Sequence, residues 1–317
     1  MTNARTPDVD LPSLDADLPS WPGRVEQLDG TGLYVRDTPG GAGGEPALYV
    51  HGLGGSATNW TDLAALLAPR LDGQAIDLPG FGFSDPAPRG GYSQPALAAR
   101  VARWIEHSGR GPVHLFGNSL GGAVSIRLAA TRPELVRSLT LVSPAVPQLR
   151  TSRDRARLVP LMFMPNIERM AARRIGDVTP AQMARGVLSL CYADVARVSP
   201  GRMAEAVAEA ERRMALPWAA EVYIRSFRGL VTSYLQPSNR SLWRLAARVQ
   251  APTLLVWGKQ DRLVPVRYAA RTARAIPGTR LLLLDGVGHT AQMEAPETVA
   301  RAVVGLLEDT ADLTCRR

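Results

Sequence analysis

The stretch Val113-His114-Leu115-Phe116-Gly117-Asn118-Ser119-Leu120-Gly121-Gly122 decides the fold of this chain. It reads as an apolar strand, a turn with glycine on both sides of a serine, and the start of a helix of small residues. A Gly-x-Ser-x-Gly pattern in this setting holds the serine on a sharp, strained turn with its hydroxyl exposed at a helix N-terminus. Ser119 is therefore the candidate nucleophile. An ordinary glycine-rich turn with a solvent-facing serine is the alternative that these residues alone leave open.

Apolar runs that predict strands alternate with amphipathic runs that predict helices on both sides of this stretch. Residues 23–29 and 32–38 alternate polar and apolar side chains around Asp29-Gly30, which predicts a β-hairpin at a sheet edge. Strands that alternate with helices predict a parallel sheet covered on both faces. The further predicted strands are 46–50, 74–77, 138–143, 253–257 and 280–284.

Residues 144–250 interrupt the alternation. They contain no clear strand, are rich in alanine, arginine and methionine, and carry repeated prolines, which predicts a set of short helices. We therefore expect an α/β core formed by residues 23–143 and 251–317, with the helical segment 144–250 inserted as a cap. Residues 1–22 are expected to form a mobile N-terminal arm.

The composition is that of a globular protein. The chain has 317 residues, 45% of them apolar, and no run approaches the ~18 consecutive apolar residues of a transmembrane helix. The acidic, proline-rich start does not resemble a signal peptide. The two cysteines, Cys191 and Cys315, suggest no disulfide framework, so a cytoplasmic location is the default expectation.

The net charge of +8 comes almost entirely from arginine, with Lys259 as the single lysine. The excess falls between Arg150 and Arg248, where the arginines are interleaved with apolar positions at helical spacing. This pattern favours solvated helix faces over the clustered basic surface of a nucleic-acid-binding protein. No nucleic-acid partner is expected. Attraction to acidic substrates or to an anionic membrane surface remains open.

Loops that follow parallel strands meet at one edge of a sheet. His289 follows the last predicted strand and Asp261 the strand before it, so both are expected to reach Ser119. An imidazole can take the serine proton, and a carboxylate can hold that imidazole in one tautomer. The order serine, aspartate, histidine along the chain is typical of this architecture. We predict Ser119, His289 and Asp261 as the catalytic residues, with Asp85 as the alternative carboxylate.

An acyl-transfer site also needs donors for the oxyanion that forms on the substrate carbonyl. The N–H groups of Leu120, directly after Ser119, and of Leu53, in the glycine-rich turn 51–55, are the predicted pair. The side chain of His51 is expected to fix that turn by hydrogen bonding. His107 and His114 are interpreted as structural.

Several motifs together resemble the α/β-hydrolase fold family over residues 23 to 310. The motifs are His51-Gly52 with Gly54-Gly55, the loop Asp77 to Asp85, the turn Gly117 to Gly122, Gly258 to Asp261, and Gly288-His289 with Pro296-Glu297. The resemblance implies an eight-stranded, mostly parallel sheet flanked by helices, with 144–250 as a helical cap over the active site. It also implies candidate pocket residues, although most of those in the cap equally suit its own core. These are Asn118, Met162, Phe163, Met164, Trp218, Tyr223, Phe227 and Tyr234.

The nucleophile narrows the chemistry that the resemblance implies. Epoxide hydrolases and haloalkane dehalogenases resemble this chain in the loops but have an aspartate nucleophile at this turn. Ser119 in that position argues against both activities. The sequence Gly-Asn-Ser-x-Gly-Gly resembles hydrolases that cleave C–C bonds of ring-opened aromatic dienoates, and Asn59 and Asn118 suit that chemistry. The turn at 51–54 is instead of the general esterase type, and Thr290 stands where those C–C hydrolases usually have tryptophan.

We therefore predict a serine hydrolase that cleaves a carboxylic ester or thioester through an acyl-enzyme, with a medium-sized acyl or lipid-like small molecule as its substrate. C–C bond hydrolysis and a non-catalytic ligand-binding role are the alternatives. Neither a metal-ligand cluster nor a nucleotide-binding pattern appears, so no cofactor and no metal are expected.

Overall fold

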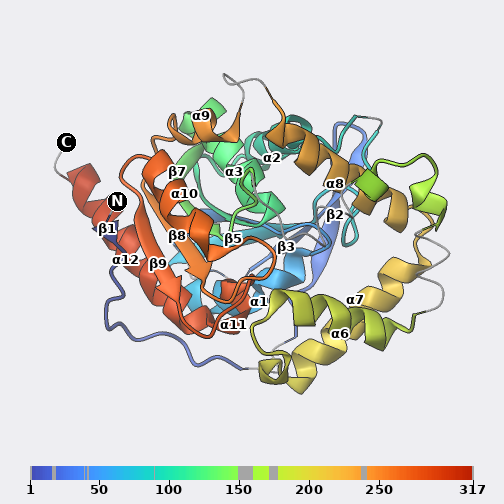
Figure 1. The fold of residues 1–317 in the computed structure, drawn as a ribbon. Coiled ribbons are helices and arrows are strands. Elements are labelled where there is room, and N and C mark those ends of the chain that lie inside the picture. The colour runs from blue at the N-terminus through green and yellow to red at the C-terminus, as the bar shows by residue number, and fades with distance from the viewer. Residues whose placement is uncertain are drawn as a thin grey trace.

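The fold is built on one sheet of nine strands in the order β1-β9-β8-β7-β6-β4-β5-β3-β2, as the computed structural model shows (Figure 1). The structure describes residues 2–15, 19–38, 40, 43–88, 90–148, 160–170, 178–236 and 241–315. Every neighbouring pair is parallel except the pairs that β3 forms with β2 and β5, so the prediction of a mostly parallel sheet is confirmed. The strands are β1 Thr2–Asn3, β2 Gly23–Leu28, β3 Thr31–Asp37, β4 Glu45–Val50, β5 Leu71–Ile76, β6 Val113–Asn118, β7 Val136–Val142, β8 Thr253–Gly258 and β9 Arg280–Leu284.

The predicted hairpin is formed by β2 and β3. Its turn residues, Asp29 and Gly30, have φ angles of 49° and 74°. Two consecutive residues in the left-handed region match the right-handed twist of the flanking strands, and Asp-Gly is among the pairs that tolerate this conformation best.

The N-terminal residues differ from the expected eight-stranded sheet with a free arm. Thr2 and Asn3 pair in parallel with β9 and add a ninth strand. The Arg5 guanidinium then forms ion pairs with Glu308 and Asp309 near the C-terminus. Val9, Leu11, Leu14 and Trp21 pack against the buried residues beneath the sheet. A strand of two residues is too short to show an alternation of polar and apolar side chains, so the sequence did not predict β1. The isolated apolar residues of this proline-rich segment did not indicate which part of the core they would contact.

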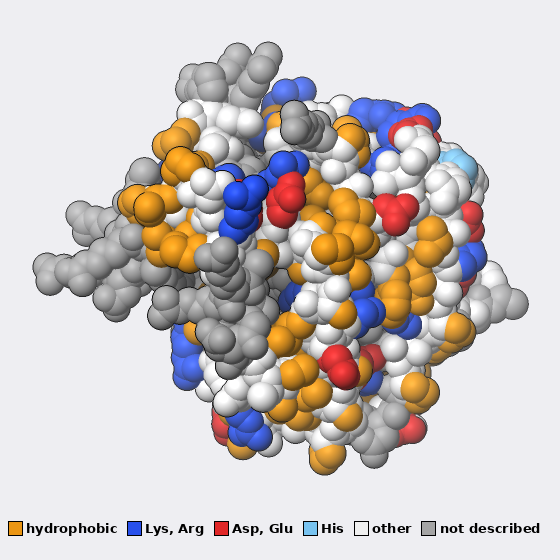
Figure 2. Space-filling model, turned by 90° about the vertical axis from the view of Figure 1, so that its right-hand side faces the viewer, with side chains coloured by type: hydrophobic (Ala, Val, Ile, Leu, Met, Phe, Trp, Pro, Cys, Tyr) orange, Lys and Arg blue, Asp and Glu red, His pale blue; other side chains and the backbone are white. Residues whose placement is uncertain are grey.

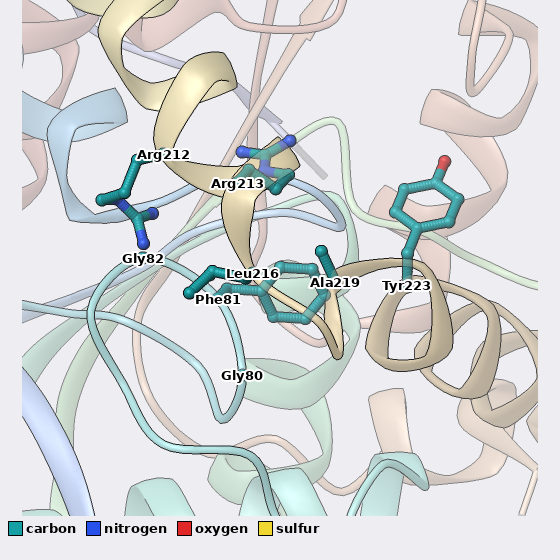
Figure 3. Close-up of a pocket in the computed structure, with 8 residues that line it drawn as sticks. All are labelled: Gly80, Phe81, Gly82, Arg212, Arg213, Leu216, Ala219 and Tyr223. Carbon is teal, nitrogen blue, oxygen red and sulfur yellow. The ribbon is translucent and has the colours of Figure 1, made fainter. Parts of the chain in front are cut away.

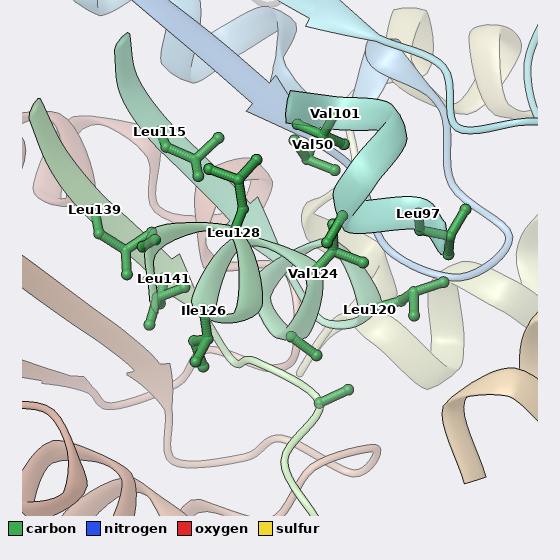
Figure 4. Close-up of a cluster of buried hydrophobic side chains, with 14 of the residues drawn as sticks. Val50, Leu97, Val101, Leu115, Leu120, Val124, Ile126, Leu128, Leu139 and Leu141 are labelled. Atoms are coloured by element: carbon green, nitrogen blue, oxygen red, sulfur yellow. The ribbon is translucent and has the colours of Figure 1, made fainter. Parts of the chain in front are cut away.

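Helices cover both faces of the sheet. On one face lie α2 Gln94–Ser108, α3 Leu120–Thr131, α9 Leu242–Ala246 and α10 Ala269–Ala275, and on the other lie α1 Thr61–Leu67, α11 Ala291–Glu294 and α12 Pro296–Cys315. The central helix α3 is buried along nearly its whole length, because Leu120, Val124 and Leu128 face a core that also contains Leu115 and Leu139 of the strands (Figure 4). This buried helix fixes the position of the turn that precedes it.

The described parts of the segment 144–250 form helices and no strand, as predicted. It contains α6 Pro180–Cys191, α7 Pro200–Ala215 and α8 Ala219–Tyr234, which lie together at one side of the molecule (Figure 1). The helix α9, which falls inside the expected cap, instead packs against α3 with Leu242, Leu245 and Ala246 buried in the core. The prolines predicted several short helices in this segment. The spacing of apolar residues in α9 showed that one side would be buried, but not whether it would pack on the cap or on the core.

The backbone of α3 approaches the end of β4 so closely that only glycine fits at position 121. A β-carbon on Gly121 would lie 2.3 Å from the carbonyl oxygen of Val50 and 2.5 Å from that of His51. We expect Gly121→Ala to lower the free energy of unfolding by about 3 kcal/mol, because backbone atoms must move to relieve the overlap. Denaturant unfolding followed by circular dichroism measures this change.

The matched control is Gly186→Ala in α6, where an added β-carbon meets nothing within 4 Å. This substitution is expected to stabilise the protein by about 0.4–1 kcal/mol, because alanine restricts the unfolded chain and favours the helix. Equal effects of the two substitutions would contradict the argument from close packing.

Candidate active site

Ser119 lies between β6 and α3 in a strained backbone conformation. Its φ of 52° and ψ of −115° fall in a region that non-glycine residues rarely occupy. Gly117 permits this turn, because a β-carbon there would lie 2.5 Å from the hydroxyl oxygen of Ser125 and 2.7 Å from the carbonyl oxygen of Gly121. Such strain at a serine that begins a helix is the geometry that the sequence pattern predicts.

His289 and Asp261 form a buried pair at the same edge of the sheet. The Nδ1–H of His289 donates to Oδ2 of Asp261 at 2.8 Å, and both side chains are buried. Oδ1 of Asp261 accepts the N–H groups of Leu263 at 2.7 Å and Val264 at 2.8 Å. Both oxygens of the carboxylate are therefore engaged, and the bond at Nδ1 leaves Nε2 of the neutral imidazole as a proton acceptor.

Asn118 connects the serine turn to the histidine loop. Its side-chain amide donates to the carbonyl oxygen of Val142 at 3.0 Å and to that of His289 at 3.1 Å. The backbone of His289 is thereby bound to the residue that directly precedes Ser119. Among the described residues, no hydrogen bond joins the Ser119 hydroxyl to His289. Hydrogen bonds between catalytic groups often form only in the complex with the substrate.

The contact of Asn118 with a substrate stays a prediction, and the structure shows a linking role for its amide group. The side chain is buried, and both amide hydrogens are bound to backbone carbonyls. Sequence reasoning identified the residue but not its direction. Asn59, the other asparagine considered, accepts the N–H of Ser56 at 3.2 Å and stabilises its own turn.

The glycine-rich turn 51–55 lies directly against Ser119. A β-carbon on Gly52 would be 3.0 Å from the β-carbon of Ser119, and the turn closes with a hydrogen bond from the N–H of Gly55 to the carbonyl of Gly52. Leu53, a predicted oxyanion donor, is partly buried against the core, and Leu120, the other, begins α3. The two N–H groups remain predictions as donors.

His51 holds this turn by two hydrogen bonds, which confirms its predicted structural role. Its Nδ1–H donates to the carbonyl of Gly52 at 2.7 Å, and its Nε2 accepts the N–H of Leu78 at 2.8 Å. The ring is fully buried beside Phe81. Burial lowers the pKa of His51 to about 4, because the charged imidazolium loses its hydration, and the bond to Gly52 offsets only part of this effect.

Asp77 is a second organiser of these loops, and sequence reasoning did not identify it as one. Its carboxylate accepts the N–H of Ala57 at 2.7 Å and the N–H of Phe83 at 2.8 Å. Burial raises the pKa of Asp77 to about 6, although the two N–H groups act in the opposite direction. An aspartate directly after an apolar strand, followed by Leu-Pro-Gly, was the available signal.

Asp85, the alternative carboxylate, is engaged elsewhere. It accepts the N–H of Gly32 on β3 at 2.9 Å, whereas the imidazole of His289 is bound to Asp261.

Glu294 joins the histidine loop to the inserted helices and was also missed. Its Oε1 accepts the N–H of Gly288 at 2.8 Å and its Oε2 accepts the N–H of Ala193 at 2.8 Å. The N–H of His289 donates to the carbonyl of Cys191 at 2.6 Å. Burial raises the pKa of Glu294. The end of α6 is therefore attached directly to the loop that carries the imidazole.

The candidate pocket residues of the cap occupy different environments. Phe163 is 43% exposed, with the guanidinium of Arg228 5.9 Å from its ring centre. The Arg228 guanidinium also donates to the carbonyl of Met162 at 2.6 Å. Trp218 is partly buried against the core, and Phe227 lies on the half-buried side of α8. Their contact with a substrate stays a prediction.

The arginine excess of the cap is dispersed among carboxylates. Figure 2 shows the side of the molecule that faces right in Figure 1, where basic, acidic and hydrophobic side chains alternate across the described surface. The ion pairs that hold these arginines are Arg202 with Asp62, Arg212 with Glu209, Arg225 with Glu221 and Arg228 with Glu168. The pairs of Arg212, Arg225 and Arg228 agree with solvated helix faces, whereas the pair of Arg202 with Asp62 is largely buried and joins α7 to α1.

The described part of the chain has neither a candidate metal site nor a candidate membrane span. It contains no group of three or more histidine, cysteine, aspartate or glutamate side chains placed to hold a metal ion. None of its helices combines the length and the apolar character that crossing a bilayer requires.

Known proteins resemble this chain over most of its length. The family model described as alpha/beta hydrolase fold matches residues 46–296. The dihydrolipoyllysine-residue acetyltransferase component of the acetoin cleaving system of Cupriavidus necator is 29% identical over 285 residues, which are 90% of this chain and 69% of that protein.

Two further relatives have hydrolase names. The 2-hydroxy-6-oxononadienedioate/2-hydroxy-6-oxononatrienedioate hydrolase of Cupriavidus pinatubonensis is 26% identical, over 87% of this chain and 90% of its own length. The monoacylglycerol lipase ABHD6 of Bos taurus is 28% identical, over 82% of this chain and 74% of its own.

The buried His51 makes the stability of the fold depend on pH. The unfolded chain protonates this imidazole near pH 6.5, whereas the folded protein does so only near pH 4. The unfolded state therefore binds more protons between these values, and stability falls as the pH is lowered from about 6.5 to about 4. The contribution of His51 is roughly 3 kcal/mol. Urea unfolding at several pH values measures it.

The matched variant is His51→Gln, which keeps one donor and one acceptor but does not titrate. Its loss of stability between pH 6.5 and 4 is expected to be smaller than that of the natural protein. Parallel curves for the two proteins would show that His51 is not the group responsible.

Proposed function

Because the chain belongs to the alpha/beta hydrolase fold family, we propose that it is a serine hydrolase that cleaves a carboxylic ester or thioester through an acyl-enzyme on Ser119. The observation that carries the proposal is the buried pair of His289 and Asp261. This pair is attached through Asn118 to the strained turn of Ser119. An imidazole oriented by a carboxylate beside an activated serine is the arrangement that acyl transfer requires.

In the proposed reaction, Oγ of Ser119 attacks the carbonyl carbon of the substrate while Nε2 of His289 takes the hydroxyl proton. Asp261 stabilises the imidazolium that forms. The N–H groups of Leu53 and Leu120 bind the oxyanion of the tetrahedral intermediate. The C–O or C–S bond to the leaving group then breaks, and His289 returns the proton to the departing alcohol or thiol. Water repeats these steps on the acyl-enzyme and releases the acid.

The strain at Ser119 and the close approach of Gly52 support this assignment of roles. Ser119 has a positive φ at the start of α3, where the first N–H groups are not bonded within the helix and can bind a negative charge. Gly52 lacks a side chain where one would touch the β-carbon of Ser119.

Ester cleavage is favoured over C–C cleavage by two observations. Both amide hydrogens of Asn118 are bound to carbonyls, so this residue has no hydrogen free for a dienoate. Thr290 is buried after His289, in a place where the dienoate hydrolases usually have tryptophan. The relatives carry names of both kinds, a lipase and a hydrolase of oxo-dienedioates. The apolar cap suits a medium-sized acyl or lipid-like substrate.

Labelling with a fluorophosphonate probe tests whether the serine is activated. The natural protein is expected to form a covalent adduct at Ser119, and Ser119→Ala is expected to abolish it, because the probe reacts only with an activated hydroxyl. Mass spectrometry of the labelled peptide identifies the site. Absence of labelling in the folded protein would contradict the proposal and favour a ligand-binding role. Turnover of a dienoate without turnover of p-nitrophenyl esters would instead indicate C–C hydrolysis.

Replacing Asp261 tests the orientation of the imidazole. We expect Asp261→Asn to reduce kcat for p-nitrophenyl esters by up to ~10⁴-fold, because an amide favours the wrong tautomer of His289. Thermal unfolding of the variant monitors its fold.

Asp85→Asn is the control, because the side-chain oxygen of asparagine can still accept the N–H of Gly32. This variant is expected to keep its activity. Loss of activity in Asp85→Asn without loss in Asp261→Asn would reverse the assignment of the carboxylate.

A further inference from the structure

A small pocket of about 10 Å³ lies where the end of α7 and the start of α8 meet the loop 80–82. Arg212, Arg213, Leu216, Ala219 and Tyr223 form its cap side (Figure 3). A volume of this size holds about one water molecule, so a substrate group that binds here must widen the gap between the cap and the loop. The pocket contains two positively charged side chains.

The pocket lies close to Ser119. A β-carbon on Gly52 would be 3.0 Å from the β-carbon of Ser119. Two residues further along the same turn, a β-carbon on Gly54 would be 3.6 Å from Nη1 of Arg213 and 3.2 Å from the ring of Tyr223. Gly54 is the chain neighbour of Leu53, the proposed oxyanion donor, so the guanidinium lies against the turn that carries Leu53.

The pocket has more positive than negative charge. Arg212 and Arg213 share a single carboxylate, that of Glu209, at 2.7 Å and 3.3 Å respectively. Glu209 is the one carboxylate within ion-pair distance of either guanidinium in the part of the chain that the structure describes. The three side chains are between 15% and 27% exposed, so water screens this excess charge only in part.

The two arginines are not equivalent. Arg212 forms two hydrogen bonds with Glu209, and its guanidinium lies 4.3 Å from the ring centre of Phe83. Arg213 has one bond to Glu209, at 3.3 Å. Figure 3 shows Arg212 extending toward Gly82, whereas Arg213 lies on the side of Tyr223. Within the described residues, Glu209 is the acceptor that Arg213 has, and its guanidinium lies against the turn that borders the serine.

We propose that Arg213 binds an anionic group of the substrate, a carboxylate or a phosphate, so that the enzyme selects acidic esters. This inference rests on the proposed function for the reaction at Ser119. A guanidinium offers several donors in a planar fork that matches both anions. Tyr223, whose hydroxyl lies on the same side as Arg213, supplies a second donor (Figure 3). Two arginines share the single carboxylate of Glu209, and the anion of the substrate supplies a second negative charge.

Matched pairs of esters test the selectivity. The carboxylate pair is mono-p-nitrophenyl glutarate and p-nitrophenyl 5-methylhexanoate, which have nearly the same shape and differ in charge. The phosphate pair is 1-butyrylglycerol 3-phosphate and 1-butyrylglycerol. We expect kcat/KM for the anionic member to exceed that of the neutral member by about tenfold to a hundredfold in one of the pairs, which identifies the anion. No preference in either pair overturns the proposal.

Variants of the two arginines separate a specific site from a general charge effect. Arg213→Gln is expected to abolish the preference, and Arg213→Lys to restore part of it. Arg212→Gln removes the same charge from the neighbouring position and is expected to keep most of the preference. Equal losses in Arg212→Gln and Arg213→Gln would show that net charge alone attracts the substrate, which overturns the assignment to Arg213. Thermal unfolding verifies that each variant is folded.

A binding measurement distinguishes failure of this inference from failure of the proposed function. Isothermal titration of the Ser119→Ala protein with monomethyl glutarate and with methyl 5-methylhexanoate requires no chemistry at the serine. Tighter binding of the anion that is lost in Ser119→Ala/Arg213→Gln supports the site even if no ester is hydrolysed. Equal binding of the two ligands contradicts it even if neutral esters are good substrates.

Discussion

The close approach of backbone to backbone around Ser119 is the constraint on which the rest of the structure depends. Gly121 brings α3 against the carbonyls of Val50 and His51, and Gly52 lies against the side chain of Ser119. The end of β4 and the start of α3 are therefore held at contact distance. The serine turn and the turn 51–55 cannot move independently, because the buried helix behind them is packed on all sides.

Buried carboxylates fix the positions of the other loops at this edge of the sheet. Asp77, Asp261 and Glu294 each accept two backbone N–H groups, and those of Glu294 belong to segments far apart in the sequence. Removing a carboxylate from water is costly unless its oxygens are hydrogen-bonded, and bonds of N–H groups to a charged acceptor are among the stronger ones. Each carboxylate thus holds the backbone of the loops that donate to it. Asp261 additionally orients the imidazole of His289.

The parts that could be predicted from the sequence are those with a local signature. The Asp29-Gly30 hairpin, the strained turn at Ser119 and the order of strands and helices follow from spacing and turn chemistry within a few residues. The pairing of Asp261 with His289 followed because loops after parallel strands meet at one edge. The roles of Glu294 and the direction of Asn118 could not be predicted, because their partners are backbone groups of distant segments, which no side-chain pattern marks.

The short strand β1 has a consequence for the outer border of the sheet. The N–H groups of Thr2 and Ala4 donate to the carbonyls of Thr279 and Leu281, on the side of β9 that no other strand occupies. An uncovered row of such carbonyl and N–H groups is a template on which strands of other molecules can add. By occupying part of that row with its own first residues, the chain disfavours self-association and aggregation through β9.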